Sequence, residues 1–283
     1  MNILYLADPN SIHDLKWISF FSNMEQYNTF ILPRYHHFKF YKRSNDKIEI
    51  KILNPIHDFS ILRFYQTCID AWRIKRIIKR NKIDLIHILY AEPNALWCLF
   101  KRYFNIPMII SCRGTDVLKT IPETFKKKTL INYIVAPAYK RAFLMADMVT
   151  GTSKSQLKSI VNLTDRNNRM KLVRTGVDIQ HNTSISQVNL PEEIKNNPYI
   201  LFPRFIKPIY NHEFCLEAIR LLPEEIKQSY QMVFVGKNDG DLRYQQIIEG
   251  MIREIPDANI LFLGKQSQDA FHELIKRSSI VVM

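Results

Sequence analysis

The chain has 283 residues, of which 46% are hydrophobic and 24% are charged. This composition excludes a disordered or fibrous protein, and the length suits two α/β domains. The formal net charge of +13 predicts a surface that attracts anions such as nucleotides, phospholipid headgroups or nucleic acid.

Short apolar runs alternate with longer amphipathic segments from the amino terminus onwards, which is typical of βαβ units and a parallel sheet. Ser11 is suited to cap the first amphipathic segment. We expect strands at 3–7, 29–32, 48–53, 84–89, 108–112, 148–151 and 170–174, with helices at about 13–24, 60–82, 94–103, 128–145 and 153–161. These elements predict one Rossmann-like half.

Residues 176–198 are polar and hold few large apolar side chains, as linkers do. We therefore expect an amino-terminal domain over 1–180 and a second domain over 181–283. The pattern restarts with strands at 199–202, 231–236, 259–264 and 280–283 and helices at 213–222, 243–255 and 268–277. No helix follows the last strand, so we expect the second domain to be incomplete.

The segment Met1–Asp8 lacks the basic and apolar regions of a secretion signal, and no apolar run approaches the ~20 residues that cross a bilayer. The cysteines Cys68, Cys98, Cys112 and Cys215 lie far apart without zinc-ligand spacing, so we expect reduced thiols. These features predict a cytoplasmic protein, at most peripheral at the inner face of a membrane.

Two strand ends in the first half carry candidate binding residues. Ser11 and His13 lie where a helix start can offer backbone N–H groups to a phosphate or sugar hydroxyl, although His13 also fits a plain surface position. Arg113 and Asp116 follow the strand at 108–112, where ligands of open α/β sheets bind. The alternative for Arg113 and Asp116 is a structural pair that stabilises the loop.

The second half offers Arg204 and Lys207 just past its first strand, which favours anion binding over two solvated loop charges. Gly236 and Gly264 each end a strand and permit either close approach of a ligand or simply a turn. The chain has only seven glycines and no GxGxxG or P-loop motif, which argues against NAD enzymes and ATPases.

The expected helix at 60–82 is rich in cations and aromatic side chains. Such a helix either presents a solvated face or rests on an anionic bilayer. Its cations are Arg73, Lys75, Arg76, Lys79, Arg80 and Lys82, with Phe64, Tyr65 and Trp72 nearby, and Lys126–Lys128 form a second basic run.

Five short motifs follow one another along the chain. They are Asp8–Trp17 (Asp-x-x-Ser-x-His-x-x-x-Trp), Asp84–His87, Arg113–Asp116, Arg174–Asp178 and Pro203–Arg204 with Ile209–Asn211. In this order they resemble the motifs of the group 1 glycosyltransferases, family 4 of the retaining GT-B enzymes. Arg113–Asp116 matches the family's His-Gly-x-Asp turn except that Arg113 replaces the histidine, and Arg204 falls where the family has its donor-phosphate arginine. Tyr210 stands where the family has a lysine, for which Lys207 is the candidate substitute.

The resemblance implies two Rossmann-like domains facing a cleft and transfer of a hexose, with anomeric retention, from a nucleotide diphosphate sugar to a hydroxyl of a surface glycan or lipid-linked acceptor. Arg204 and Lys207 would hold the diphosphate, with Gly236 and Gly264 on the donor side. Ser11, His13, Arg113 and Asp116 would line the acceptor side. No cofactor, metal or nucleic acid is expected.

The chain ends before the family's Glu-x7-Glu segment, so we expect residues 1–283 to be weakly active or inactive. Two other functions stay open at this point. One is a sugar-nucleotide epimerase of the same fold, which needs no acceptor. The other is a basic nucleic-acid-binding protein, although the chain has no recognised nucleic-acid-binding motif.

Overall fold

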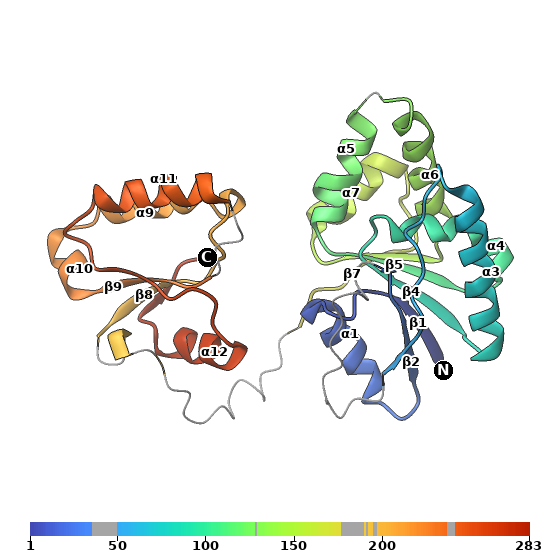
Figure 1. Ribbon diagram of the computed structural model, residues 1–283, viewed down its shortest axis with the longest axis horizontal. Coiled ribbons are helices and arrows are strands. Elements are labelled where there is room, and N and C mark those ends of the chain that lie inside the picture. The colour runs from blue at the N-terminus through green and yellow to red at the C-terminus, as the bar shows by residue number, and fades with distance from the viewer. Residues whose placement is uncertain (36–49, 128, 177–189, 191, 195–196, 237–240) are drawn as a thin grey trace. The chain divides into compact units, whose positions relative to one another are not determined.

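The computed structural model describes residues 1–35, 50–127, 129–176, 190, 192–194, 197–236 and 241–283. The chain divides into two compact units, Met1–Gly176 (unit 1) and Val177–Met283 (unit 2) (Figure 1). Lys128 and the residues Val177 and Asp178 of the fourth motif lie outside the described residues.

Unit 1 is built on a seven-stranded sheet with the order β3-β2-β1-β4-β5-β6-β7. Every neighbouring pair is parallel, as the alternation of strands and helices predicts. The strands are β1 (Asn2–Leu6), β2 (Asn28–Leu32), β3 (Lys51–Ile52), β4 (Leu85–Leu89), β5 (Met108–Cys112), β6 (Met148–Gly151) and β7 (Met170–Leu172).

Helices cover both faces of this sheet (Figure 1). Along β1, Leu4 faces a core shared with α3 and α6, while Tyr5 faces a smaller core closed by Ile18 of α1. Successive strand residues point to opposite faces, so a strand that is buried on both sides is apolar throughout. The helical segments are α1 (Ile12–Ser22), α3 (Phe64–Arg80), η1 (Asn94–Phe100), α4 (Lys101–Phe104), η2 (Asp116–Thr120), α5 (Ile121–Lys126), α6 (Asn132–Met145) and α7 (Lys154–Thr164).

Three helices of unit 1 differ from expectation. Helix α3 begins at Phe64 rather than at Ser60, because Ser60 exchanges two hydrogen bonds with the Thr67 hydroxyl and the segment between them turns. The expected helix at 94–103 is mostly 3-10 helix. The expected helix at 128–145 begins at Asn132, and the helices η2 and α5 before it were not predicted.

Unit 2 has a four-stranded parallel sheet with the order β10-β9-β8-β11. Phe202 and Phe234 face a core with α9 and α11, and Leu201 and Val233 face a core with α12. The elements are η3 (Glu192–Ile194), β8 (Tyr199–Phe202), η4 (Pro208–Tyr210), α9 (His212–Arg220), α10 (Glu224–Ser229), β9 (Gln231–Phe234), α11 (Leu242–Arg253), β10 (Ile260–Phe262), α12 (Gln268–Arg277) and β11 (Ile280–Val281).

The two parallel sheets, each with helices on both faces, confirm the expected α/β fold of Rossmann-like type. Helix α10 is the one addition to the elements expected in the second half among the α-helices that the structure describes. Within the described residues, no helix is both long and apolar enough to cross a membrane.

Candidate functional site

A cavity of about 410 Å³ opens at the carboxyl ends of the unit 1 strands. This edge is where parallel α/β sheets bind ligands, because the loops that follow the strands meet there. Its lining comes from the segments after β1, β2, β4, β5, β6 and β7. The residues are Asp8, Ser11, His13, Asp14, Arg34, Leu89, Tyr90, Asn94, Arg113, Thr152 and Thr175.

The start of α1 brings two of the expected residues to this cavity. The Ser11 hydroxyl accepts a hydrogen bond from the Asp14 N–H at 3.3 Å, which confirms Ser11 as the cap of α1. His13, in the first turn of α1, is exposed and lines the cavity. Ser11 and His13 therefore reach the same cavity as Arg113.

Arg113 lies beside a carboxylate that the sequence analysis did not select, Asp14. The guanidinium Nη2 of Arg113 lies 3.4 Å from Asp14 Oδ1, and the guanidinium also lies over the Trp17 ring, 5.4 Å from its centroid. The Asp8 N–H donates to Asp14 Oδ2 at 3.1 Å. Trp17 and Asp14 thus fix the position of the arginine fork at the cavity.

Burial raises the pKa of Asp14 to about 6, although the hydrogen bond from Asp8 and the charge of Arg113 both oppose the rise. The Asp14 side chain is only 7% exposed, so desolvation of its charged form outweighs the neighbouring cation. Spacing offered one signal, since Ser11 and Asp14 stand three residues apart as in a helix capping box. The Asp14 carboxylate instead accepts hydrogen bonds from the Asp8 N–H and from the Arg113 guanidinium.

His87 of the second motif lies behind the cavity, within β4. Its Nε2 lies 2.7 Å from the Ser111 hydroxyl, which in turn lies 2.7 Å from the Thr150 hydroxyl. Burial lowers the pKa of His87 to about 3, and the positive charge of Arg113 adds to the shift. A neutral His87 therefore joins three adjacent strands through side chains.

Asp116 does not line the cavity, contrary to its expected place on the acceptor side. Its side chain is fully buried, and the carboxylate accepts hydrogen bonds from the backbone N–H groups of Ala91, Arg113, Gly114 and Val117, at 2.8–3.2 Å. The structural alternative agrees with these contacts, because Asp116 stabilises the loop through the Arg113 backbone N–H, while the Arg113 guanidinium pairs with Asp14. Asp116 shapes the turn that carries Arg113.

In unit 2, the cations Arg204 and Lys207 follow β8. Arg204 is exposed, and its guanidinium lies 5.4 Å from the centroid of the Tyr210 ring. The Lys207 ammonium lies 6.0 Å from the centroid of the Phe205 ring. Tyr210 therefore supports the Arg204 guanidinium through a cation–π contact.

The two expected glycines lie beside the Arg204 loop, at the ends of β9 and β10. A Cβ atom on Gly236 would lie 2.5 Å from the Arg204 carbonyl oxygen and 2.7 Å from the Phe205 Cα, which is too close for any side chain. The Gly236 N–H donates to the Gly264 carbonyl at 3.0 Å. The structure thus brings Arg204, Gly236 and Gly264 together at one edge of the sheet.

Sequence reasoning missed the support beneath this loop. His212 is buried, and burial lowers its pKa, a shift that backbone hydrogen bonds with Arg204 and Lys207 oppose. The Tyr244 hydroxyl accepts from the His212 N–H and donates to the Glu213 carboxylate. The sequence around His212 gives no signal of a special role. The contact between His212 and the loop that carries Arg204 and Lys207 is therefore seen only in the structure.

Arg34 and Tyr90 of the unit 1 cavity were missed as well. Arg34 reaches the cavity from the loop after β2 and forms an ion pair with Asp58 at 3.0 Å. Tyr90 follows β4 and has a φ of 76°. In the described part of the chain, no three His, Cys, Asp or Glu side chains gather as metal ligands, and all four cysteines are free.

Comparison with known proteins gives a family and a fold. The family model described as "Glycosyl transferase 4-like" matches residues 2–153. No curated protein sequence matches the chain significantly.

Solved structures match almost the whole chain at low sequence identity. A glycosyltransferase from Rickettsia africae is 17% identical with a TM-score of 0.73, over 99% of this chain and 72% of its own. Anabaena HepE, in complex with UDP and glucose, is 15% identical with a TM-score of 0.67, over 99% and 73%. The lipopolysaccharide outer core galactosyltransferase WaaB is 15% identical with a TM-score of 0.58, over 99% and 73%.

Proposed function

Because the chain belongs to the glycosyl transferase 4-like family, we propose that it transfers a hexose from a nucleotide diphosphate sugar to a hydroxyl of a surface glycan or lipid-linked acceptor, with anomeric retention. The match over residues 2–153, more than half of the chain, is the observation that carries this proposal. The likeness to GT-B glycosyltransferase structures over 99% of the chain agrees with it.

UDP-glucose is the first donor to test, because Anabaena HepE has been solved with UDP and glucose and with UDP-glucose. The acceptor class takes its support from WaaB, a lipopolysaccharide outer core galactosyltransferase. A thermal-shift series of nucleotide diphosphates and their sugars would identify the nucleotide, since a ligand that binds only the native state raises the unfolding temperature.

Arg204 and Lys207 bind the donor diphosphate in this proposal. Charge grows on the diphosphate as its bond to the sugar C1 breaks, so fixed cations stabilise the transition state more than the ground state. The Tyr210 ring and the backbone contact with Gly236 hold Arg204 in place before the donor arrives. Gly264, whose Cβ position meets no atom within 4 Å, leaves room for the donor beside this loop, and Gly236 lets the loop approach the donor side of the sheet.

The unit 1 cavity receives the acceptor or the transferred sugar in this proposal. Ser11, His13 and Arg113 supply hydroxyl, imidazole and guanidinium groups to sugar oxygens, and Asp14 positions Arg113. The acceptor oxygen bonds to the sugar C1 while the C1–phosphate bond breaks, and the acceptor proton passes to the departing phosphate oxygen. This route needs no side chain as general base.

In a full-length version of the enzyme, Arg204→Ala should lower turnover by roughly 10²–10³, by analogy with the loss of one preorganised oxyanion donor. The assay is sugar transfer from labelled UDP-glucose, with the nucleotide-induced thermal shift as a second measurement. Arg253→Ala is the matched control, because Arg253 is an exposed arginine of α11 in the same unit. Equal turnover in the two variants would remove Arg204 from the donor site.

The two alternative functions give different results in simple assays. An epimerase converts or releases the sugar without any acceptor, whereas a transferase consumes donor in proportion to the acceptor supplied. A nucleic-acid-binding protein retains RNA on a filter with strong salt dependence and shows no shift with UDP-sugars. A transferase gives acceptor-dependent product and no specific RNA retention.

The proposed location is the cytoplasm, at the inner face of the membrane. Four free cysteines, two of them buried, suit a reducing compartment. Nucleotide sugars and a lipid-linked acceptor would meet at that face. Fractionation of cells that express a tagged chain tests the location, and a secreted or exclusively nucleoid-bound chain would contradict it.

A further inference from the structure

Helix α3 has two faces that differ in what they contact. Its inner face holds Ala71, Ile74 and Ile78, which are buried in the unit 1 core. The outer face carries a second set of apolar side chains, each about half exposed or more.

The outer set follows the helical repeat. Its members are separated by three or four residues, so they form one stripe along α3 and the turn before it. The stripe consists of Leu62 (76% exposed), Tyr65 (69%), Ile69 (48%) and Trp72 (54%), and the same spacing continues into Arg76 and Arg80. An aromatic and aliphatic stripe therefore runs directly into two exposed arginines.

A cavity of about 630 Å³ lies where the stripe meets the arginines. Arg73, Arg76 and Arg80 line it together with Trp72, and among the described residues no carboxylate does. The Arg76 guanidinium lies over the Trp72 ring, 5.5 Å from its centroid. Arg73 is paired with Asp70, so Arg76 and Arg80 are the guanidinium groups that make this cavity suited to phosphate oxygens.

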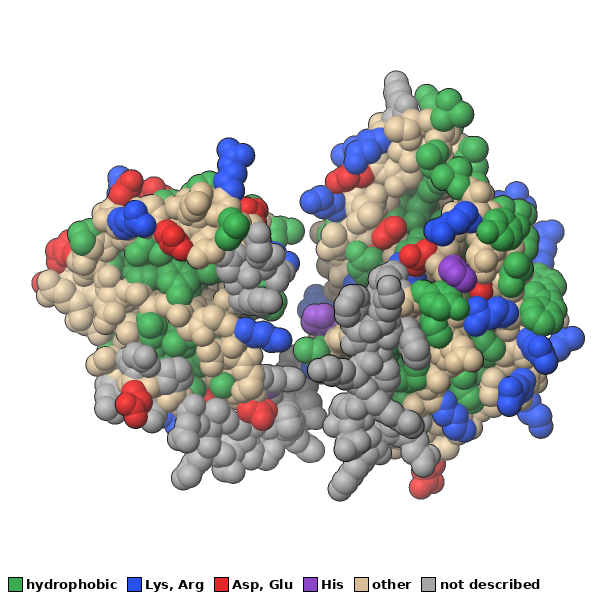
Figure 2. All heavy atoms as spheres, in the orientation of Figure 1, with side chains coloured by type: hydrophobic (Ala, Val, Ile, Leu, Met, Phe, Trp, Pro, Cys, Tyr) green, Lys and Arg blue, Asp and Glu red, His purple; other side chains and the backbone are tan. Residues whose placement is uncertain are grey.

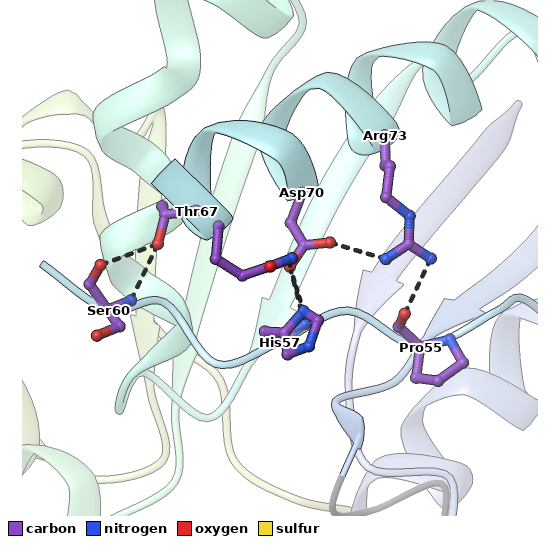
Figure 3. A network of polar contacts seen from close by, with 7 residues as sticks. Pro55, His57, Ser60, Thr67, Asp70 and Arg73 are labelled. Atoms are coloured by element: carbon purple, nitrogen blue, oxygen red, sulfur yellow. Dashed lines mark hydrogen bonds and ion pairs between the residues drawn. The ribbon is translucent and has the colours of Figure 1, made fainter. Parts of the chain in front are cut away.

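A network of hydrogen bonds joins α3 to Pro55 and His57, in the segment before this helix (Figure 3). The fully buried Asp70 carboxylate accepts from Arg73 Nη1 at 2.7 Å and from the His57 N–H at 3.0 Å, and His57 Nδ1 lies 2.9 Å away. Arg73 also donates to the Pro55 carbonyl at 3.0 Å. The outer face is therefore presented on a rigid support.

Helix α3 and the residues that flank it are strongly basic. From Ser60 to Lys82 the sequence has seven cations and a single acid, Asp70, which the network just described neutralises. Figure 2 shows hydrophobic and basic side chains side by side at the right-hand edge of unit 1, where Figure 1 places α3. Sequence left open whether this basic aromatic helix is solvated or bound to a bilayer.

We propose that the α3 face, defined as Leu62, Tyr65, Ile69, Trp72, Arg76 and Arg80, docks on an anionic lipid bilayer. The apolar stripe lies at the boundary between headgroups and acyl chains, and Arg76 and Arg80 hold a headgroup phosphate in the cavity. A soluble phosphate ester would use the cavity but leave the stripe without a role, which is why the bilayer is the occupant. The proposal does not depend on the transfer reaction.

Cosedimentation with vesicles tests the role of the arginines. The chain should bind vesicles of phosphatidylcholine mixed with phosphatidylglycerol and bind pure phosphatidylcholine far less. Arg76→Gln with Arg80→Gln should lower the partition coefficient about 30-fold, since each cation near an anionic surface contributes about fivefold. The matched control is Lys154→Gln with Lys158→Gln, which removes two exposed cations four residues apart on α7 and should leave binding nearly unchanged.

Tryptophan fluorescence tests the orientation, because Trp72 is the exposed tryptophan while Trp97 is fully buried and Trp17 lies under Arg113. Brominated lipids should quench the wild type and the Trp17→Phe variant, and should quench Trp72→Phe little although it still sediments. Unchanged circular dichroism of each variant establishes that the fold is intact.

Three results would overturn the proposal. The first is full vesicle binding by the double arginine variant. The second is loss of vesicle binding on Leu130→Ser with Tyr133→Ser, two exposed apolar residues near α6, but not on changes to the α3 face. The third is a thermal shift with inorganic phosphate that Arg76 and Arg80 control, without any vesicle binding.

Discussion

Asp14 and Asp116 are two buried carboxylates that serve different ends. Backbone N–H groups surround Asp116 and satisfy its oxygens, so its charge is compensated by the turn that it shapes. Asp14 receives one backbone N–H and a longer contact with Arg113, so desolvation prevails and its pKa rises to about 6. The Asp116 carboxylate therefore has a structural role, whereas the Asp14 carboxylate can change the charge beside Arg113.

Asp14→Asn should change how stability depends on pH. A raised pKa means that the folded protein binds the proton more tightly, so the contribution of Asp14 is fully present below about pH 3.8 and is lost as the pH rises through about 6. Relative to Asp14→Asn, the wild type should gain on the order of 2–3 kcal/mol between about pH 7 and pH 4. Urea unfolding of both proteins across this range measures the difference, and a constant difference would contradict the raised pKa.

Asp116→Ala should destabilise unit 1 by about 3 kcal/mol or more, because several buried N–H groups lose their acceptor together. The free energy of unfolding from urea titration is the measurement. Ser11→Ala, which removes one cap, should cost only about 1 kcal/mol. A stable Asp116→Ala variant with a raised acceptor KM would instead assign the carboxylate to ligand binding.

At the scale of elements, both candidate sites lie at the carboxyl ends of parallel strands. The β8, β9 and β10 ends of unit 2 converge because Gly236 lets the Arg204 loop approach and donates to Gly264. In unit 1 the α1 start and the β5 turn meet through Asp14 and Arg113. Each site is thus a contact between loops on neighbouring strands.

Gly236→Ala should shift the Arg204 backbone, since a Cβ would lie 2.5 Å from its carbonyl oxygen. We expect a loss of about 1–3 kcal/mol of stability and weaker donor binding, measured by urea unfolding and by the UDP-induced thermal shift. Gly250→Ala is the control, because Gly250 lies within α11 with open space around its Cβ position. The Gly250→Ala variant should gain up to about 1 kcal/mol of stability. Equal stability and equal donor binding of the two variants would refute the close contact between Gly236 and the Arg204 loop.

At the scale of the whole molecule, the described core residues form clusters that each belong to one unit. The two clusters of unit 1 surround its sheet, and the two of unit 2 surround the other. Separate cores of this size can fold separately.

Residues 1–176 should therefore fold without unit 2. Leu4→Ala, at a fully buried position of β1, should lower the stability of this fragment by about 2–5 kcal/mol. In the full chain it should lower the transition of unit 1 alone, whereas Leu216→Ala should lower that of unit 2. Circular dichroism and thermal unfolding of the fragment and both variants are the measurements, and an unfolded fragment would contradict the prediction.

Sequence predicted most elements because their signals are local. The apolar run Met108–Cys112 and the amphipathic run Gln268–Arg277 match β5 and α12 in the structure. The helices η2 and α5 were missed because Pro122 and two threonines, Thr120 and Thr124, weaken the helical signal of residues 116–126. They form where Asp116 takes the N–H of Ala91, a partner 25 residues away.

By itself, the sequence determined the parallel α/β class, the order of the strands along the chain and the positions of Ser11, Arg113 and Arg204 at strand ends. Apolar periodicity and motif order are properties of neighbouring residues, so they can be read without coordinates. Only the tertiary structure decided that Asp116 is buried in its turn, that Asp14 pairs with Arg113, and that the aromatic stripe of α3 lies outside the core. These facts depend on which distant loops and faces meet, because burial and partner distance set the energy of a charge or an apolar side chain.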